Sequence, residues 1–194
     1  MLRFLSTTIG ICSLALAAGC SDAPKFKSTD ITGVDYGSSF ELPDTEGKLR
    51  RIADFKGSAV VLFFGYTHCP DVCPTTLADL ENVMQQLGPE AERVKVLFVT
   101  VDPERDTPGS LESYVHAFDE RFIGLRGNAE ATQRVAKDFK IYFEKRKEGD
   151  SYSVDHSAQS YVFDPQGRLR LLVRPQEIRS ALPDDLRTLL NENS

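Results

Sequence analysis

The sequence has little cysteine, little histidine and no excess of positive charge. Its 194 residues include four cysteines and three histidines, and 29 Asp and Glu outnumber 23 Lys and Arg, for a net charge of −6 at pH 7. This acidic balance argues against nucleic-acid binding, which requires a basic face. The contents of 41% hydrophobic and 27% charged residues are ordinary for a globular protein, and the length suggests one domain.

The sequence also has no long, uninterrupted apolar run at its N-terminus. Phe4 to Ala18 is mostly apolar but contains Ser and Thr, and it follows a short positive start at Arg3. This pattern is typical of a secretory signal rather than of a spanning helix. The segment Ala17-Ala18-Gly19-Cys20 resembles the lipobox of bacterial lipoproteins, with Ala17 where Leu is more usual. The resemblance implies cleavage before Cys20 and a lipid on that cysteine; ordinary cleavage and an uncleaved anchor are the alternatives.

These features predict three segments. Residues 1–19 form a lipoprotein-type signal peptide. Residues 20–35 are polar, turn-rich and without periodicity, which predicts a flexible tether. Residues 36–194 form one folded domain.

Two cysteines remain in the folded part, Cys69 and Cys73, because Cys12 lies within the signal and Cys20 ends it. An exported protein faces an oxidising compartment. The pair therefore becomes a disulfide unless a reductant or a metal ion keeps it open.

The stretch that carries this pair predicts a strand followed by a helix. Val60 to Phe64 is a short apolar run, typical of a strand buried on both faces, and Gly65 ends it. A helical pattern extends from Pro74 to Leu87. Cys69 and Cys73 therefore lie between a strand end and a helix start, where open α/β sheets place their chemistry.

Each of the two cysteines precedes a proline, which disfavours the helical conformation. We therefore expect Cys69 in a loop and Cys73 near the N-cap, with Pro74 as the first helical residue. The helix N-terminus would favour a thiolate at Cys73. The pair can be a redox pair or bind a soft metal. A structural disulfide or two inert thiols is the alternative, although closing so short a loop would stabilise the fold little.

The other elements follow from periodicity and turn residues. A hairpin is predicted over 38–52, strands over 94–101, 122–125, 141–147, 160–163 and 168–173, and helices over 110–117, 128–139 and 175–191, the last interrupted at Pro183. Residues 148–156 are predicted to be a loop or a short hairpin. This order predicts an α/β fold: a mixed central sheet with helices on both faces and an N-terminal β-hairpin. A thioredoxin-like fold satisfies it.

Three motifs resemble the Sco/SenC copper proteins. Phe63-Phe-Gly-Tyr-Thr-His-Cys-Pro-Asp-Val-Cys-Pro-Thr-Thr76 looks like the signature of that family. Thr100-Val-Asp-Pro-Glu-Arg-Asp-Thr-Pro108 and Val154-Asp-His-Ser157 resemble its second motif and its histidine segment. The resemblance covers about residues 40–190.

The resemblance implies one copper ion, Cu(I) or Cu(II), bound by Cys69, Cys73 and His156. It implies a metallochaperone, anchored to the membrane through Cys20 and facing the periplasm of a bacterial cell envelope. Its partner would be subunit II of cytochrome c oxidase, whose dinuclear copper site it helps assemble by delivering copper, by reducing the site's cysteines, or both. A second periplasmic copper chaperone and a thiol reductant are further expected partners.

The ligand chemistry agrees with this implication. Thiolates favour Cu(I) and imidazole tolerates Cu(II), so two cysteines and one histidine suit both oxidation states. Three protein ligands leave a coordination position open, which permits hand-over. His156 is distant from Cys73 in sequence, so only the fold can join them.

Other polar residues near the motifs have two interpretations each. His68 is a loop residue or a partner contact, and His116 is packed or exposed on a helix. Asp155 could orient the ring of His156, although a separation of one residue in sequence is an awkward reach for such a contact. Asp102 and Asp106 either shape the site or serve as helix caps and turn formers.

Asp71, between the two cysteines, is likewise a partner contact or a turn former. Its position alone does not separate these two roles.

An enzyme of the cell envelope is the alternative function: a thiol-disulfide oxidoreductase or a peroxidase-like protein. Both functions need Cys69 and Cys73, but only the metallochaperone needs His156. A peroxidase also needs an activating group beside one cysteine of low pKa, and Thr67 is the available residue.

Overall fold

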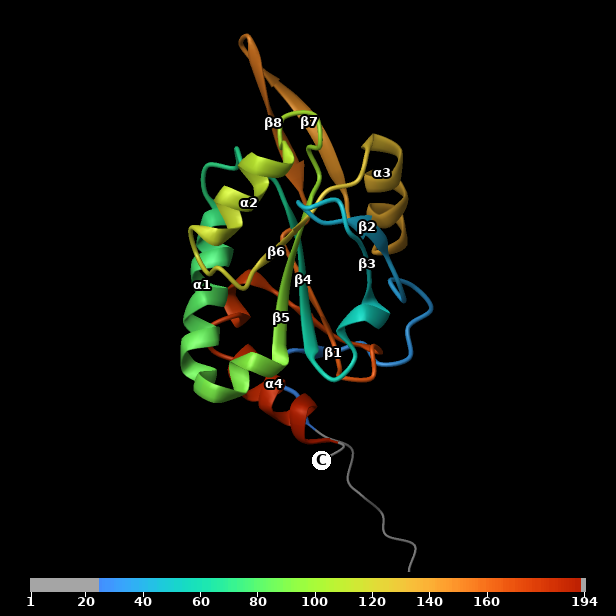
Figure 1. Cartoon of the computed structure of the whole chain (residues 1–194), viewed down its shortest axis with the longest axis vertical. Helices are drawn as coiled ribbons and strands as arrows, with labels where there is room; N and C mark the ends of the chain where they lie inside the picture. The colour runs from blue at the N-terminus through green and yellow to red at the C-terminus, as the bar shows by residue number, and fades with distance from the viewer. Residues whose placement is uncertain (1–24, 193–194) are drawn as a thin grey trace, which may run out of the picture.

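A computed structural model of the chain describes residues 25–192 (Figure 1). The predicted signal peptide, its cleavage site and the lipidated Cys20 lie outside the described residues. None of the helices within 25–192 is long and apolar enough to cross a membrane.

A six-stranded mixed sheet forms the centre, in the order β1-β10-β9-β4-β5-β6. The neighbours β4, β5 and β6 are parallel, and β4/β9, β9/β10 and β10/β1 are antiparallel. The strands are β1 (Thr29–Asp30), β4 (Ala59–Gly65), β5 (Val94–Thr100), β6 (Ile123–Leu125), β9 (Ser160–Phe163) and β10 (Leu169–Val173). Helical crossovers produce the parallel part and a tight turn joins β9 to β10, as predicted.

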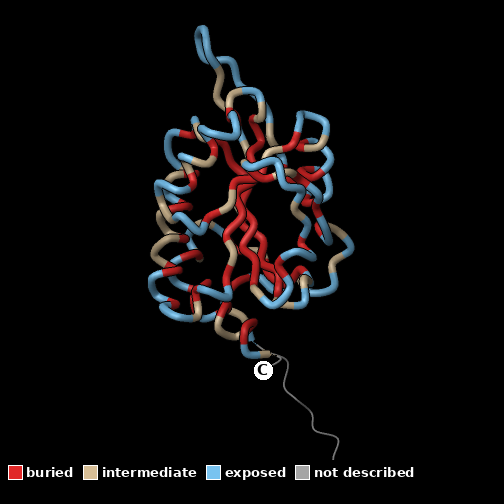
Figure 2. Tube along the Cα trace, in the orientation of Figure 1, coloured by how far each residue is buried: buried red, intermediate tan, exposed pale blue. Residues whose placement is uncertain are grey.

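In the described part of the chain, four α-helices cover this sheet, with α1 and α3 on opposite sides of β4 and β5 in Figure 1. They are α1 (Val72–Leu87), α2 (Pro108–His116), α3 (Ala129–Asp138) and α4 (Leu182–Asn191). Because both faces are covered, all seven residues of β4 are buried, and they lie at the centre of the core, which is red in Figure 2. The predicted thioredoxin-like α/β architecture is confirmed.

Helix α1 begins two residues earlier than predicted. Asp71 is its N-cap residue, so Cys73 lies inside the first turn and Pro74 is not the first helical residue. Cys73 is helical although it precedes Pro74, and residues before proline usually prefer an extended backbone. A proline in the first turn removes no helical hydrogen bond, because the first N–H groups of a helix have no acceptor within it. Cys69 lies in a loop, as predicted.

The remaining elements match the predictions in kind, with shifts at their ends. Asn128 caps α3 by accepting a hydrogen bond from the Ala131 N–H at 2.8 Å. The final helix is broken, as expected, but Pro183 lies at the start of α4 rather than at the break. The N-terminal hairpin is β2 (Glu41–Pro43) with β3 (Leu49–Arg51), and 3₁₀ turns cover Ile52–Phe55, Gly88–Arg93 and Pro175–Glu177.

Residues 148–156 adopt the hairpin interpretation rather than the loop. Strands β7 (Phe143–Glu148) and β8 (Ser151–His156) pair over six residues each and project from one end of the molecule (Figure 1). Gly149 turns the chain between them with φ +59°, a left-handed conformation that favours glycine. His156 is therefore the last residue of a strand.

Residues 25–35, predicted as part of a tether, pack on the domain. Strand β1 extends the sheet, and Phe26, Ile31 and Val34 contact the core. The buried carboxylate of Asp185 accepts hydrogen bonds from the backbone N–H groups of Lys27 and Ser28, at 2.8 and 2.9 Å.

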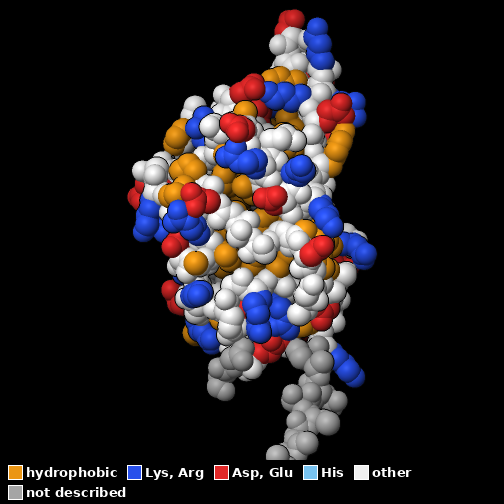
Figure 3. Space-filling view, turned by 90° about the vertical axis from the view of Figure 1, so that its right-hand side faces the viewer, with side chains coloured by type: hydrophobic (Ala, Val, Ile, Leu, Met, Phe, Trp, Pro, Cys, Tyr) orange, Lys and Arg blue, Asp and Glu red, His pale blue; other side chains and the backbone are white. Residues whose placement is uncertain are grey.

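The surface does not carry a basic face on the side that Figure 3 shows. There, patches of Lys and Arg are interspersed with patches of Asp and Glu, between uncharged areas.

Asp185→Ala should loosen the N-terminal segment. The substitution leaves two backbone N–H groups without their acceptor, so we expect the free energy of unfolding to fall by about 1–3 kcal/mol in urea denaturation. Asp184→Ala is the control, because within residues 25–192 the carboxylate of this exposed neighbour pairs with the surface cations Lys27 and Arg187. Equal losses in the two variants would contradict the role given to Asp185.

Candidate metal centre

Three potential ligands from distant parts of the chain meet at the carboxyl end of β4. Cys69 comes from the loop after β4, Cys73 from the first turn of α1 and His156 from the end of β8. Their sulfur and nitrogen atoms all lie within 4.8 Å of one another. The Cys73 Sγ is 3.3 Å from the His156 Nε2. The fold therefore brings together the three residues that the sequence singled out.

Gly65, the last residue of β4, makes room for this arrangement. A β-carbon at this position would lie 2.6 Å from the Cys73 Sγ and 2.9 Å from the Phe98 ring. Contacts this short are not tolerated, so any side chain at residue 65 would push Cys73 away. The glycine permits the close approach of α1 to the strand end.

Tyr66 connects all three ligands, a role that the sequence analysis did not assign. Its backbone N–H donates to the Cys73 sulfur, and its carbonyl accepts from the Cys69 N–H at 3.2 Å. Its hydroxyl accepts from the Val154 N–H at 3.2 Å, and its ring meets the His156 ring edge-on at 5.8 Å. In the sequence, the one feature that could have indicated this role of Tyr66 was its position directly after a buried strand and a glycine.

The pKa values of the two cysteines shift in opposite directions. The cysteines are not joined in a disulfide. The Cys73 thiol donates a hydrogen bond to the Cys69 sulfur, which lowers the pKa of Cys69 well below that of an ordinary thiol; the backbone N–H groups of Asp71 and Cys73 contribute further. The same bond and complete burial raise the pKa of Cys73. The thiolate is therefore Cys69.

This assignment corrects the expectation of a thiolate at Cys73. The helix N-terminus favours an anion there, but Cys73 is 0% exposed and Cys69 is 9% exposed. Burial disfavours the charged form of a thiol, and a neighbouring thiolate disfavours a second negative charge. Cys69 can instead collect hydrogen bonds from several donors at once.

The ring of His156 is oriented by a backbone carbonyl. Its Nδ1 lies 2.9 Å from the carbonyl oxygen of Ser157, so Nδ1 carries the proton and Nε2 presents a lone pair to the cysteines. Asp155 does not orient the ring, contrary to our suggestion, because its carboxylate accepts from the Arg146 guanidinium at 2.8 Å. Successive strand residues point to opposite faces, which explains the difference.

Asp106 holds the loop that leads to the cysteines. This buried carboxylate accepts from the Thr67 hydroxyl at 2.6 Å, from the Thr67 N–H at 3.1 Å and from the Thr100 hydroxyl at 2.5 Å. It caps no helix, because Thr107 caps α2. Of its two interpretations, the structure favours a part in shaping the site.

Asp102 is also fully buried, and it contacts the histidine strand. It accepts from the Tyr152 hydroxyl at 2.9 Å and from the Arg105 Nε at 2.5 Å. Asp102 thus belongs to the surroundings of the site as well.

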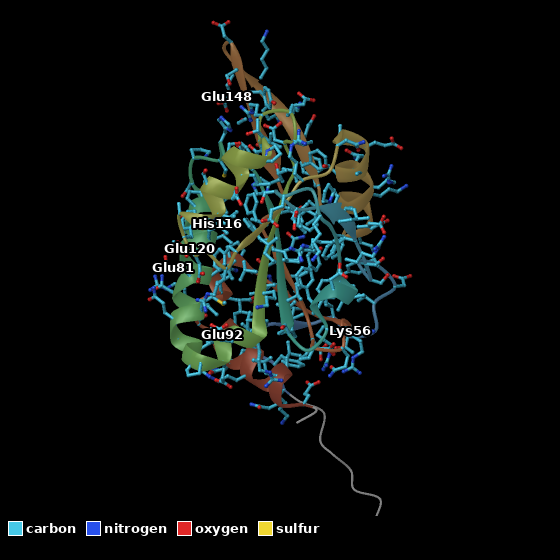
Figure 4. All side chains as sticks on the ribbon, viewed as in Figure 1. Lys56, Glu81, Glu92, His116, Glu120 and Glu148 are labelled. Atoms are coloured by element: carbon cyan, nitrogen blue, oxygen red, sulfur yellow. The ribbon has the colours of Figure 1, made fainter. Side chains whose placement is uncertain are left out.

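The other histidines stand outside the group. His68 is exposed, with its Nδ1 3.0 Å from the Thr67 hydroxyl and 3.6 Å from Asp106. His116 is exposed at the end of α2 (Figure 4). The Thr67 hydroxyl donates to Asp106, so the peroxidase interpretation gains no support from Thr67.

A groove of about 510 Å³ opens beside the ligands. Cys69 and His156 line it, together with Tyr66, Asp71 and residues of the β8 strand, whereas Cys73 does not. An incoming molecule would therefore meet Cys69 and His156 first. The donor set, two sulfur atoms and one imidazole nitrogen, is suited to a soft metal ion such as copper.

The fold and this group of ligands define a thioredoxin-like protein with a candidate Cys-Cys-His metal centre. A family model described as SCO1/SenC matches residues 28–191. The chain belongs to the SCO1/SenC family.

Known members of this family resemble the chain in sequence and in structure. The mitochondrial SCO2 homolog of Bos taurus is 43% identical over 132 residues, covering 66% of this chain and 50% of that protein. The chain thus spans about half the length of this curated relative. The copper-bound structure of Bradyrhizobium japonicum ScoI is 36% identical, with a TM-score of 0.69 and coverage of 78% and 97%. The solution structure of apo Sco1 from Thermus thermophilus is 38% identical, with a TM-score of 0.73 and coverage of 84% and 95%.

The lowered pKa of Cys69 predicts how this residue reacts with iodoacetamide in the reduced, metal-free chain. The rate should change little from about pH 6 to about pH 8, because the lowered pKa keeps Cys69 a thiolate, whereas an ordinary thiol gains nearly tenfold per unit. Cys73→Ala removes the S–H donor and should make the rate rise with pH. Mass spectrometry of each alkylated cysteine measures this. A nearly tenfold rise per pH unit in the unaltered chain would contradict the assignment.

Proposed function

We propose that the chain is a copper metallochaperone that carries one copper ion, Cu(I) or Cu(II), on Cys69, Cys73 and His156. The observation that carries the proposal is the convergence of these three ligand atoms within 4.8 Å. The copper-bound relative supports the choice of metal. The acceptor is subunit II of cytochrome c oxidase, whose dinuclear copper site the protein helps assemble.

The three ligands have different roles in binding and releasing the ion. Cys69 is already a thiolate, and Cys73 must lose its proton to become a ligand, so copper affinity should fall as pH falls. Three protein ligands leave room for a ligand from the acceptor. This ligand approaches from the groove, where Cys69 and His156 are accessible and Cys73 is not.

Reduction of the acceptor's cysteines is the second candidate function, and the thiolate at Cys69 favours it. The Cys69 sulfur attacks a disulfide of the partner, and a mixed disulfide forms as one partner thiolate leaves. Cys73 then gives up its proton and attacks the Cys69 sulfur, which releases the second partner thiolate. The partner gains two electrons and the Cys69–Cys73 pair becomes a disulfide, so a thiol reductant must restore it.

The proposed location is the periplasmic side of a bacterial cell envelope. The lipobox-like segment before Cys20 supports a lipid anchor at that residue. Residues beyond the anchor would then connect it to the N-terminal strand β1.

Anaerobic copper titration of the reduced chain tests the proposal. We expect one copper ion per chain, with thiolate-to-Cu(II) charge-transfer bands that Cys69→Ala and Cys73→Ala abolish. His156→Ala should weaken copper binding about 100-fold or more, since loss of a ligand costs at least as much as loss of the groups that orient it. His68→Ala and His116→Ala are matched controls that should bind copper normally.

Two further measurements separate the candidate functions. Transfer of copper to the copper-free domain of subunit II would support delivery. Catalytic disulfide reduction by a chain that binds no stoichiometric copper would contradict the metallochaperone and favour the oxidoreductase. Both activities, with only copper binding lost in His156→Ala, would show that delivery and reduction coexist.

A further inference from the structure

His156 belongs to an element that lies outside the central sheet. Strands β7 and β8 form a separate two-stranded sheet, and most of their residues are exposed. Figure 1 shows this hairpin extending beyond the body of the molecule. An isolated two-stranded hairpin is marginally stable at best. The position of His156 therefore depends on contacts that fasten β8 to the domain.

Arg105, from the loop after β5, fastens β8 to the domain through a hydrogen bond and a ring contact, and Lys145 of β7 also pairs with Glu104 of the same loop at 2.6 Å. The Arg105 Nη1 donates to the backbone carbonyl of Tyr152 at 2.7 Å, and its guanidinium carbon lies 3.7 Å from the centre of the Tyr152 ring. Its Nε donates to Asp102, whose other oxygen accepts from the Tyr152 hydroxyl. We call Asp102, Arg105 and Tyr152 the arginine clamp.

The clamp also reaches the cysteine side of the site. The guanidinium carbon of Arg105 is 5.7 Å from the centre of the Tyr66 ring, and Tyr66 is hydrogen-bonded to both cysteines and to Val154. Arg105 thus contacts one aromatic residue attached to the cysteines and one on the strand of His156. A lysine would not reproduce this arrangement, because it lacks a planar group that stacks and donates from several nitrogens.

We propose that Arg105 is a positioning residue of the metal centre: the arginine clamp holds β8 so that His156 stays at ligand distance from Cys69 and Cys73. Arg105 itself contacts none of the three ligands through a hydrogen bond that the structure shows. It acts through Tyr152, four residues before His156. The inference rests on the proposed copper site, but part of its test needs no metal.

Hydrogen exchange of the metal-free full chain tests the clamp directly. Arg105→Met should speed amide exchange in residues 151–156 at least tenfold and leave β4 and β5 unchanged, because the hairpin loses its attachment and the core does not. Tyr152→Phe, which keeps the ring and removes one hydrogen bond, should have a smaller effect. Arg121→Met is the matched control, since Arg121 also pairs with nearby carboxylates, Asp119 and Glu92.

Arg105→Lys serves if the methionine variant does not fold. It keeps the positive charge beside Asp102 but loses the planar group, so exchange in 151–156 should still increase. Unchanged exchange in this segment in a folded Arg105 variant would overturn the proposal.

A double-mutant cycle then shows through which ligand Arg105 acts. In the unaltered chain Arg105→Met should weaken copper binding about 10- to 100-fold. In the His156→Ala background it should cause no further loss, since the clamp then has no ligand to position. An equal loss in both backgrounds would overturn the proposal, because Arg105 would then act on the cysteines or the whole fold. Absence of copper binding by the unaltered chain would instead refute the proposed function, and the exchange result alone would decide whether the clamp holds β8.

Discussion

The candidate metal centre depends on the single residue that follows the central strand. Tyr66 bonds through its backbone to both cysteines and through its hydroxyl to the strand that ends at His156. Tyr66 directly follows β4, and the burial of this strand along its whole length fixes the position of the Tyr66 backbone. Tyr66 thus contacts the three separate segments that carry the candidate ligands. The absence of a side chain at Gly65 allows Cys73 to lie close to this strand end. The protein's own contacts therefore place these candidate ligands beside one another.

Buried carboxylates complete the support on either side. Asp106 fixes the start of the cysteine loop, and Asp102 orients Arg105 and Tyr152 below the histidine strand. Both follow β5, the parallel neighbour of β4, so the two strand ends deliver the ligands and their supports to the same sheet edge. Burying such charges is costly unless they are hydrogen-bonded, and each of them is. The buried carboxylates at this sheet edge therefore hold the segments that carry the candidate ligands in place.

The sequence predicted the features that depend on local patterns. The apolar run Val60 to Phe64 identified the central strand, and the Cys69 and Cys73 motif identified the site. It misplaced the start of α1, because a proline is tolerated in the first turn of a helix. It misplaced the thiolate, because the charge depends on how far Cys73 is buried, which is a property of the packed fold. It assigned Asp155 to His156 through proximity in sequence, although neighbouring strand residues face opposite sides. Tyr66 and Arg105 went unrecognised because their partners lie 88 and 47 residues away.

X-ray absorption spectroscopy at the copper edge tests the central claim most directly. We expect copper bound to the reduced chain to be surrounded by two sulfur atoms and one imidazole nitrogen from the protein. In His156→Ala the imidazole contribution should disappear and both sulfur atoms should remain. A spectrum with fewer than two sulfur atoms, or one that His156→Ala leaves unchanged, would contradict a site built from Cys69, Cys73 and His156.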